Sequence, residues 1–334
     1  MIVDIKEKDD FGYGASVIIC CYNSALRLPQ TLQHLAKQVI PQNFFVEIIL
    51  VDNASTDNTV ETANKIWNEF EPKNITIKVI NEPKPGQMFA RKTGVRNAGF
   101  ECIIFCDDDN WLCENYIFLA HQLISEDKTI GAAGGQNLPV TNVDGYPKWF
   151  EEYKDKYGLG IPAKNSGDVS YKTFVLGAGM ATRKSLFYQI FDNRYPTLLN
   201  GRNGDKLSTG DDFEYCKRLL LWDYKLYYDE NMILYHFIPK ERLTLEYRKR
   251  LQSGIDEAGI ILSEYDLAIR VHKKIKNKNN IRLFILSPFR ILLTQMGLSK
   301  RVAVDEKLIF FYLAPILVRS NSVKGQIKKF IHHK

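Results

Sequence analysis

The sequence predicts an α/β fold, in which a mostly parallel central sheet is flanked by helices and followed by a C-terminal helical tail. Short apolar runs recur along the first 130 residues, and they alternate with segments whose apolar residues have helical spacing. The 334 residues are 45% hydrophobic and 25% charged, which is ordinary for a globular protein with a sizeable core. We expect an α/β domain over residues 1–240 and a helical, basic region over residues 241–334.

The apolar runs and the segments between them justify each element in turn. The predicted strands are residues 15–21, 46–51, 75–80 and 102–106, and the predicted helices are residues 26–39, 59–70 and 87–98. In the first helix, one face carries Leu28, Leu32, Leu35 and Val39, which are spaced four, three and four residues apart. Asp57 precedes the second helix and is positioned to cap it. Apolar strands joined by single helices are typical of parallel sheets that are buried on both faces.

Ligands of such sheets bind at the carboxyl ends of the strands, so the residues that follow each strand are candidate site residues. Polar side chains follow three of the four strands: Tyr22, Asn23, Asp52, Asn53, Asp107, Asp108 and Asp109. Asn and Asp also favour turns for local reasons, and this interpretation stays open for residues 51–59 taken alone. The aspartate triplet is harder to explain as a turn, because adjacent like charges at a strand end repel one another.

The triplet at residues 107–109 indicates a hard divalent cation, Mg²⁺ or Mn²⁺. Such cations prefer oxygen ligands and share them with phosphate groups. The sequence contains no GxxxxGK[ST] loop and no GxGxxG after the first strand, which argues against a P-loop nucleotidase and a dinucleotide enzyme. We therefore expect a diphosphate that is held through the metal.

Cysteine usage and the start of the chain bear on the cellular compartment. Four of the six cysteines lie in or beside apolar strand-like runs, and no pair of CxxC modules is present. We expect reduced core thiols, and a zinc site is disfavoured. The first fourteen residues carry mixed charges and lack the apolar core of a secretory signal, so we expect a cytoplasmic protein.

The net charge of +6 is unevenly distributed. From residue 265 onward, fifteen Lys and Arg face three acidic residues, a balance of +12 that leaves residues 1–264 at −6. A basic region of this kind favours an anionic surface, whereas the acidic remainder argues against a nucleic-acid groove.

Two apolar segments, residues 283–293 and 308–318, lie within this basic region. Each spans about eleven residues and is interrupted by Pro288 or Pro315, well short of the roughly twenty residues that cross a bilayer. We expect these segments to lie in the interface of an anionic membrane, which would make the protein peripheral on the cytoplasmic face. The alternative is a helical subdomain that packs on the body of the protein.

Five strings occur in the order seen in one known family: SVIICCYN, ILVDNASTDNT, PGQMFARKTGVRNAG, IFCDDDN and STGDDFEYCKRL. Over about residues 15–240 the chain resembles family 2 glycosyltransferases, in particular bacterial enzymes that build surface polysaccharides. The resemblance implies the GT-A fold and inverting transfer of a sugar from a nucleoside diphosphate donor, UDP above others. The implied acceptor is a hydroxyl of a glycan or a lipid-linked acceptor.

Two other functions stay open. A sugar-phosphate nucleotidyltransferase should carry a glycine-rich phosphate loop after the first strand, which CCYNSALRLP lacks. A non-catalytic partner in a membrane-bound synthesis complex should have lost Asp109 or Asp212, and both are present.

The resemblance also assigns roles to individual residues. The implied nucleotide-sugar-binding residues are Tyr22, Asn23, Asp52, Asn53, Arg91, Asp107 and Asp108, and the implied metal ligands are Asp109, Asp107 and His236. Asp107 and Asp109 match the outer positions of the family's DxD motif. Arg91 could equally be a solvated helix residue, and His236 could be a structural residue among aromatic neighbours.

The acidic pair in the string STGDDFEYCKRL, Asp211 and Asp212, supplies the chemistry that the resemblance implies. Inversion requires a carboxylate that takes the proton of the attacking acceptor hydroxyl, and Asp212 is the candidate base, with Asp211 beside it. The family motif usually reads Glu-Asp, whereas here it reads Asp-Asp. Alternatively, both acids simply begin a helix, where carboxylates favour the positive end of the dipole. Residues 141–168 are expected to be loops on the acceptor side, where Trp149 and Gly179 are the candidate lining residues.

Overall fold

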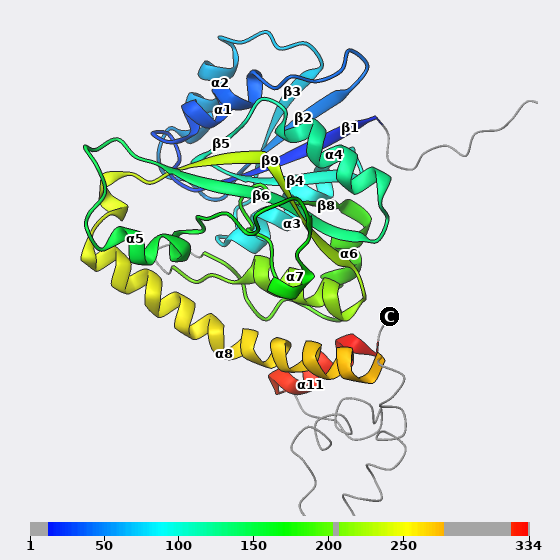
Figure 1. Cartoon of the computed structure of the whole chain (residues 1–334). Helices are drawn as coiled ribbons and strands as arrows, with labels where there is room; N and C mark the ends of the chain where they lie inside the picture. Colours follow the sequence, from blue (N-terminus) through cyan, green and yellow to red (C-terminus); the bar gives the residue numbers. More distant parts are fainter. Residues whose placement is uncertain (1–12, 203–206, 277–321, 333–334) are drawn as a thin grey trace, which may run out of the picture.

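Within the described residues 13–202, 207–276 and 322–332, nine strands form one central sheet of this computed structural model (Figure 1). The spatial order is β3-β2-β1-β4-β8-β6-β9-β5, and β7 pairs with β9. The strands are β1 (Gly14–Cys21), β2 (Phe45–Asp52), β3 (Ile75–Asn81), β4 (Cys102–Asp107), β5 (Asn110–Leu112), β6 (Ile130–Val140), β7 (Gly167–Asp168), β8 (Ala181–Arg183) and β9 (Lys225–Phe237).

Four neighbouring strands, β3, β2, β1 and β4, pair in parallel, as predicted for the four strands expected within the first 130 residues. Their register places Cys21 opposite Asp52 and Cys20 opposite Asp107, so the carboxyl ends of these strands are level. The rest of the sheet is mixed, because β8 runs antiparallel to both β4 and β6, while β6 and β9 are parallel. The predicted α/β fold is confirmed, and its parallel character is concentrated in the first four strands.

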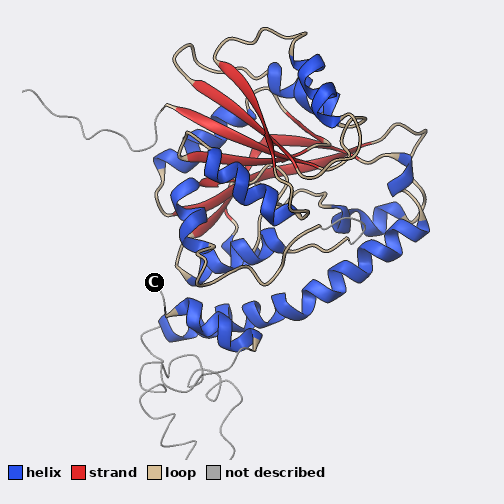
Figure 2. Ribbon diagram, turned by 180° about the vertical axis from the view of Figure 1, so that it is seen from behind, coloured by secondary structure: helices blue, strands red, loops and turns tan. Residues whose placement is uncertain are grey.

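Helices cover both faces of the sheet (Figure 2). They are α1 (Leu28–Ala36), α2 (Thr59–Trp67), α3 (Gln87–Asn97), α4 (Tyr116–Glu126), α5 (Phe150–Tyr153), α6 (Lys184–Ile190), α7 (Asp211–Leu221), α8 (Leu245–Lys276) and α11 (Val323–Ile331), with short 3-10 turns η1 (Lys154–Tyr157), η2 (Ser170–Lys172) and η3 (Lys240–Arg242). Val17 and Ile19 of β1 pack with α1, α2 and α4, whereas Ile18 packs with α3, α6 and α7. Successive strand residues point to opposite faces, so an unbroken apolar run requires helices on both sides.

The first predicted helix is longer than the observed one. Leu28, Leu32 and Leu35 are fully buried as predicted, but α1 ends at Ala36 and Val39 lies beyond it with 56% of its surface exposed. The N-cap position of α2 is Asn58 and not the predicted Asp57, and the Asn58 side chain makes no cap hydrogen bond. Asp57 lies one residue earlier, where its Oδ1 accepts a hydrogen bond from the backbone N–H of Thr59 at 3.1 Å. The differences therefore concern helix ends, where local spacing is least informative.

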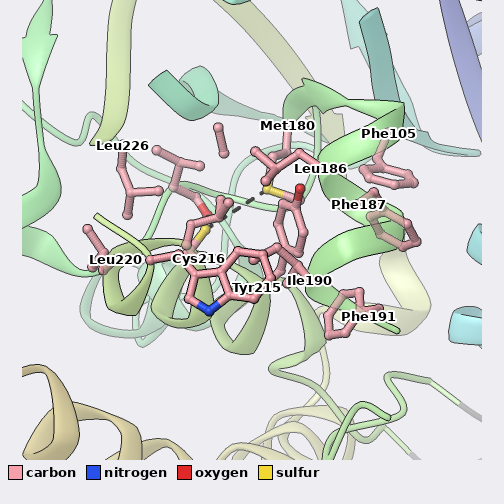
Figure 3. Packing of buried hydrophobic residues seen from close by; sticks show 14 of the residues in the cluster. Phe105, Met180, Leu186, Phe187, Ile190, Phe191, Tyr215, Cys216, Leu220 and Leu226 are labelled. Atoms are coloured by element: carbon pink, nitrogen blue, oxygen red, sulfur yellow. Dashed lines mark hydrogen bonds between the residues drawn. The ribbon is translucent and has the colours of Figure 1, made fainter. Parts of the chain in front are cut away.

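A dense aromatic core lies between the sheet and α6 and α7 (Figure 3). The rings of Phe187 and Phe191 meet edge to face with centroids 5.2 Å apart, and the Tyr215 ring lies 5.5 Å from Phe187. Full burial of one such side chain contributes about 1.5–3 kcal/mol. This packing fixes the position of α7, whose first turn carries the two acids predicted to be catalytic.

The described parts of the C-terminal region pack on the body of the protein (Figure 1). Tyr265 and Ile269 of α8 and Ile327 and Phe330 of α11 are buried in the same core cluster as α7. The Phe330 ring stacks on Trp222 with centroids 5.0 Å apart. These contacts favour the helical subdomain for the described part of the region, whereas the two apolar segments at 283–293 and 308–318 lie outside the described residues.

Three further expectations concern thiols, the loops at residues 141–168 and membrane spans. All six cysteines are free, and four of them are buried, as expected for reduced core thiols. Residues 141–168 contain the short elements α5, η1 and β7 among loops. Across residues 13–202, 207–276 and 322–332, the helices are too short or too polar to cross a bilayer.

Candidate functional site

A pocket of about 570 Å³ opens at the carboxyl ends of β1, β2 and β4. Seven of the predicted site residues line it: Tyr22, Asn23, Asn53, Asp107, Asp108, Asp109 and His236. His236 reaches the pocket from β9, because β9 pairs with β5 and places His236 opposite Asn110. The predicted ligand edge of the sheet is therefore hollowed into a cavity.

Two asparagines of this pocket fasten its loops. Asn23 adopts a φ of 51°, which Asn tolerates better than most residues, and its Oδ1 accepts a hydrogen bond from the Thr56 N–H at 2.8 Å. Asn53 Nδ2 donates to the Lys84 carbonyl at 2.8 Å, and its Oδ1 accepts from the Gly86 N–H at 2.8 Å. These amides join the loops that follow β1, β2 and β3, so they shape the pocket wall.

The aspartate triplet is engaged by arginines. Arg27 Nη2 lies 2.5 Å from Asp108 Oδ2, and Arg242 Nη1 lies 2.6 Å from Asp109 Oδ2. Both aspartates are buried, and their charges are paired across the pocket floor. The like-charge repulsion that the sequence indicated is therefore offset by Arg27, which directly precedes α1, and by Arg242 of the segment after β9.

Two carboxyls of the triplet have pKa values shifted in opposite directions. Burial raises the pKa of Asp107 and outweighs the positive charge of Arg91. Burial also opposes ionisation of Asp109, but Arg242 and His236 outweigh it and hold the pKa of that carboxyl well below its usual range. Asp109 is therefore held as an anion in the pocket lining.

The chemistry of Asp109 and His236 fits a divalent cation. His236 Nε2 lies 3.5 Å from Asp109 Oδ1, and its Nδ1 is buried without a hydrogen-bond partner among the described residues. Carboxylate oxygen and imidazole nitrogen are both ligands of divalent metals. Asp107 does not complete a set, because the described part of the chain holds no group of three or more His, Cys, Asp or Glu side chains spaced to bind a metal.

Arg91 and Asp52 lie outside the pocket lining. Arg91 is buried in α3 and pairs with Asp211 of α7, with Nη1 2.5 Å from Oδ2, so it is not a solvated helix residue. Burial lowers the pKa of Arg91, but the charges of Asp211, Asp107 and Asp212 outweigh it and raise that pKa. Asp52 is half-buried, and its Oδ1 has no hydrogen-bond partner among the described residues. Arg91 thus links the pocket electrostatically to the start of α7.

Asp212 lies in the first turn of α7, and neither it nor Asp211 is among the residues that line the pocket. Its Oδ2 accepts a hydrogen bond from the Gly177 N–H at 3.0 Å, and its Oδ1 accepts from the Phe213 N–H at 2.9 Å. Burial, together with the negative charge of Asp211, raises the pKa of Asp212 to about 6. A carboxylate with this pKa is ionised at neutral pH and is a stronger base than an exposed aspartate.

Gly201 connects the pocket wall to the acidic helix. It has a φ of +66°, and a Cβ at this position would lie 2.8 Å from Gln87 Oε1 and 2.9 Å from Asp211 Oδ1. The neighbouring Arg202, which lines the pocket, accepts a hydrogen bond at its carbonyl from the Gln87 N–H at 2.9 Å. Only glycine allows this loop to pass between the two groups without displacing one of them.

The two residues predicted for the acceptor side do not line this pocket. Gly179 is buried, and a Cβ there would lie 2.1 Å from the Tyr116 hydroxyl, which donates to the Gly179 carbonyl at 2.9 Å. Gly179 is therefore a packing position against α4. Trp149 precedes α5 and is half-buried, with the Arg248 guanidinium 5.1 Å from its ring centroid.

Three arginines of the pocket were not singled out from the sequence: Arg27, Arg202 and Arg242. Arg27 follows Tyr22 by five residues, and Arg242 follows His236 by six. Two of these arginines could have been found from the sequence, because each follows shortly after a polar strand end and a diphosphate requires positive partners.

Known proteins resemble this chain over a region that includes most of the pocket lining. The sequence profile described as Glycosyl transferase family 2 matches residues 16–191. Glycosyltransferase GlyG of Streptococcus pneumoniae is 28% identical over 227 residues, which cover 66% of this chain and 69% of GlyG. Poly(ribitol-phosphate) beta-N-acetylglucosaminyltransferase TarS of Staphylococcus aureus is 32% identical over 111 residues, which cover 33% of this chain and only 19% of TarS.

The fold is also shared with solved structures. Residues 1–349 of S. aureus TarS, solved in complex with UDP-GlcNAc, have a TM-score of 0.51 and 18% sequence identity, covering 89% of this chain and 78% of that chain. The same segment of TarS solved without that ligand has a TM-score of 0.50. This likeness confirms the fold that the sequence resemblance implied.

Proposed function

The chain belongs to glycosyl transferase family 2, and on that premise we propose that it transfers a sugar from a nucleoside diphosphate donor to a hydroxyl of a glycan or lipid-linked acceptor, with inversion. The observation that carries the proposal is the pocket at the strand ends, where buried carboxylates and arginines lie side by side. Paired charges of both signs suit a ligand that consists of a diphosphate and a cation.

We propose UDP as the nucleotide. Support comes from TarS, which has the same fold and was solved with UDP-GlcNAc. Tyr22 and Asn53 line the pocket beside the loops after β1 and β2, where the family resemblance puts the base and ribose. The arginines of the lining, Arg27, Arg202 and Arg242, supply the positive charge for the diphosphate.

We propose that Asp109 and His236 hold a divalent cation, Mn²⁺ or Mg²⁺, with Asp107 nearby. When bound, the cation neutralises charge on the diphosphate leaving group. Asp109 is held ionised by its surroundings, so it presents a full negative charge to the ion. Asn110 Nδ2 donates to Asp109 Oδ1 at 3.1 Å and orients that carboxylate.

We propose Asp212 as the general base. The acceptor hydroxyl forms the new bond to the anomeric carbon, its proton passes to the Asp212 carboxylate, and the bond to the diphosphate breaks with the electron pair leaving on the nucleotide. The Gly177 and Phe213 N–H groups orient the carboxylate from the backbone. Asp211 keeps α7 in place through its ion pair with Arg91.

We also propose that the C-terminal region contacts an anionic membrane surface. The balance of +12 after residue 265 supports this, together with the exposed Arg270, Lys273 and Lys274 on α8 and Lys324 and Lys329 on α11. In a vesicle flotation assay, the protein is expected to float with phosphatidylglycerol vesicles and to remain unbound with phosphatidylcholine vesicles. Equal behaviour with both would contradict the proposal.

Thermal unfolding with nucleotide sugars tests the main proposal. A ligand present at a hundred times its Kd stabilises the folded protein by about 2.7 kcal/mol. We expect stabilisation by a UDP-sugar with MnCl₂, a smaller effect with EDTA, and release of UDP from that donor over time. If UDP-, GDP- and dTDP-sugars all leave the unfolding temperature unchanged, the proposed donor class is wrong.

A further inference from the structure

Arg242 is ion-paired with Asp109, the carboxylate that is proposed to bind the cation. Its Nη1 lies 2.6 Å from Asp109 Oδ2, and the two side chains are 15% and 3% exposed. The other carboxylate oxygen accepts a hydrogen bond from Asn110 Nδ2 and faces His236 Nε2. A cation that takes Asp109 as a ligand therefore competes with the guanidinium of Arg242 for the same group.

The backbone of Arg242 is held while its side chain reaches into the pocket. Its carbonyl accepts a hydrogen bond from the Tyr157 hydroxyl at 2.9 Å, and its N–H donates to the Pro239 carbonyl at 2.9 Å. Buried residues of the segment after β9, including Leu243, pack with Tyr157 in a separate apolar cluster. With its backbone held, Arg242 can change partners only through its side chain.

The pocket offers Arg242 a second kind of partner. A guanidinium binds phosphate oxygens through two parallel N–H groups, as it binds carboxylates. The lining carries equal numbers of the two charges, three arginines and three aspartates: Arg27, Arg202, Arg242, Asp107, Asp108 and Asp109. A diphosphate entering alone adds unpaired negative charge, and a cation entering alone adds unpaired positive charge.

We propose that Arg242 couples cation binding to donor binding by exchanging Asp109 for the diphosphate. This inference rests on the proposed function, which supplies the diphosphate and the cation. A cation alone takes Asp109 from the half-buried Arg242, and a diphosphate that draws Arg242 away leaves the buried Asp109 without its counter-charge. Both outcomes are unfavourable. When both ligands bind, every charge is paired, so each ligand strengthens binding of the other by the same factor.

The test measures the affinity for Mn²⁺, with and without UDP, from the electron paramagnetic resonance signal of the free ion. The wild type is expected to bind Mn²⁺ at least about 5-fold more tightly with UDP, within the usual coupling range of about 5- to 150-fold. Arg242→Gln should bind Mn²⁺ alone at least about 5-fold more tightly than the wild type, with the coupling factor reduced correspondingly. The matched control is Arg248→Gln, since Arg248 lies over the rings of Trp149 and Tyr153 and should leave both affinities unchanged.

Two further variants keep the test decisive. Arg27→Gln also removes one positive charge from the pocket, but the partner of Arg27 is Asp108 and not Asp109. It should therefore raise the affinity for Mn²⁺ alone less than Arg242→Gln does. Arg242→Lys keeps the charge and should give an intermediate affinity. It replaces Arg242→Gln if a thermal melt shows that the Gln variant is not folded.

The outcomes separate this inference from the function on which it rests. If Arg242→Gln leaves the Mn²⁺ affinity unchanged, or if Arg27→Gln raises it equally, the exchange is wrong while the proposed donor and cation stand. If the wild type binds no Mn²⁺ even with UDP, the proposed cation site and this inference both fall.

Discussion

Arg91 of α3 and Asp211 of α7 form an ion pair in the interior, with Nη1 2.5 Å from Oδ2 and side chains that are 6% and 4% exposed. The pair joins two helices that lie 120 residues apart in the sequence. It anchors the start of α7, where Asp212 accepts a hydrogen bond from the Gly177 N–H.

Breaking this pair should strongly destabilise the protein. Arg91→Met leaves the Asp211 carboxylate buried without a counter-charge, which typically costs about 3–5 kcal/mol. Urea unfolding of the variant measures the loss, and Arg91→Met combined with Asp211→Leu should recover most of it, because neither member of the pair is then left as an unpaired buried charge. Equal stability of the wild type and Arg91→Met would show that the pair is not formed in solution.

Asp212→Asn should lose turnover and keep donor affinity. The amide preserves the size of the side chain and can still accept the hydrogen bond from Gly177, but it cannot take a proton. General-base catalysis typically contributes about 10²- to 10⁴-fold in rate, and transfer should fall by that range. The measurements are sugar transfer and UDP binding for each variant. Normal transfer by Asp212→Asn would place the base elsewhere.

The transfer rate should fall on the acid side with an apparent pKa of about 6. The base acts only when deprotonated, so the rate rises as the pH rises through this pKa and levels off above it. Asp211→Asn should move this limb to lower pH, since it removes a negative charge that raises the pKa of Asp212. Asp155→Asn, an exposed substitution on η1, is the control and should leave the limb in place.

Asp109→Ala should abolish cation-dependent nucleotide binding. Asp109 faces His236 as well as Arg242, whereas Asp108 pairs with Arg27. Calorimetry with UDP and MnCl₂ should therefore show a complete loss for Asp109→Ala and a smaller change for Asp108→Ala. Tight UDP binding by the wild type in EDTA would contradict a role for the cation.

Phe330→Ala should destabilise the whole protein. The Phe330 ring stacks on Trp222 and lies 4.9 Å from the Arg218 guanidinium, inside the main core. Truncation of a buried Phe typically costs about 3–5 kcal/mol, measured here by urea unfolding. Lys329→Ala, the exposed neighbour, is the matched control. Identical unfolding of both variants would show that α11 does not stabilise the body.

Much of the fold could be predicted from local patterns. The strands before residue 110 follow from apolar runs, and their parallel pairing follows from the single helices between them. The position of the pocket followed as well, because parallel strands end at one edge, where Asp107, Asp108 and Asp109 lie. The mixed half of the sheet could not be predicted, since β8 is only three residues long and has no clear period.

The sequence by itself determined the fold class, the ligand edge of the sheet and the concentration of carboxylates there, because all three depend on residues that are neighbours along the chain. Only the tertiary structure decided the partners of the charges. Arg242 and Asp109 are 133 residues apart and Arg91 and Asp211 are 120 apart, and no periodicity relates them. Such pairs form because folding takes each charge out of water, and a buried charge is unfavourable unless an opposite charge lies next to it.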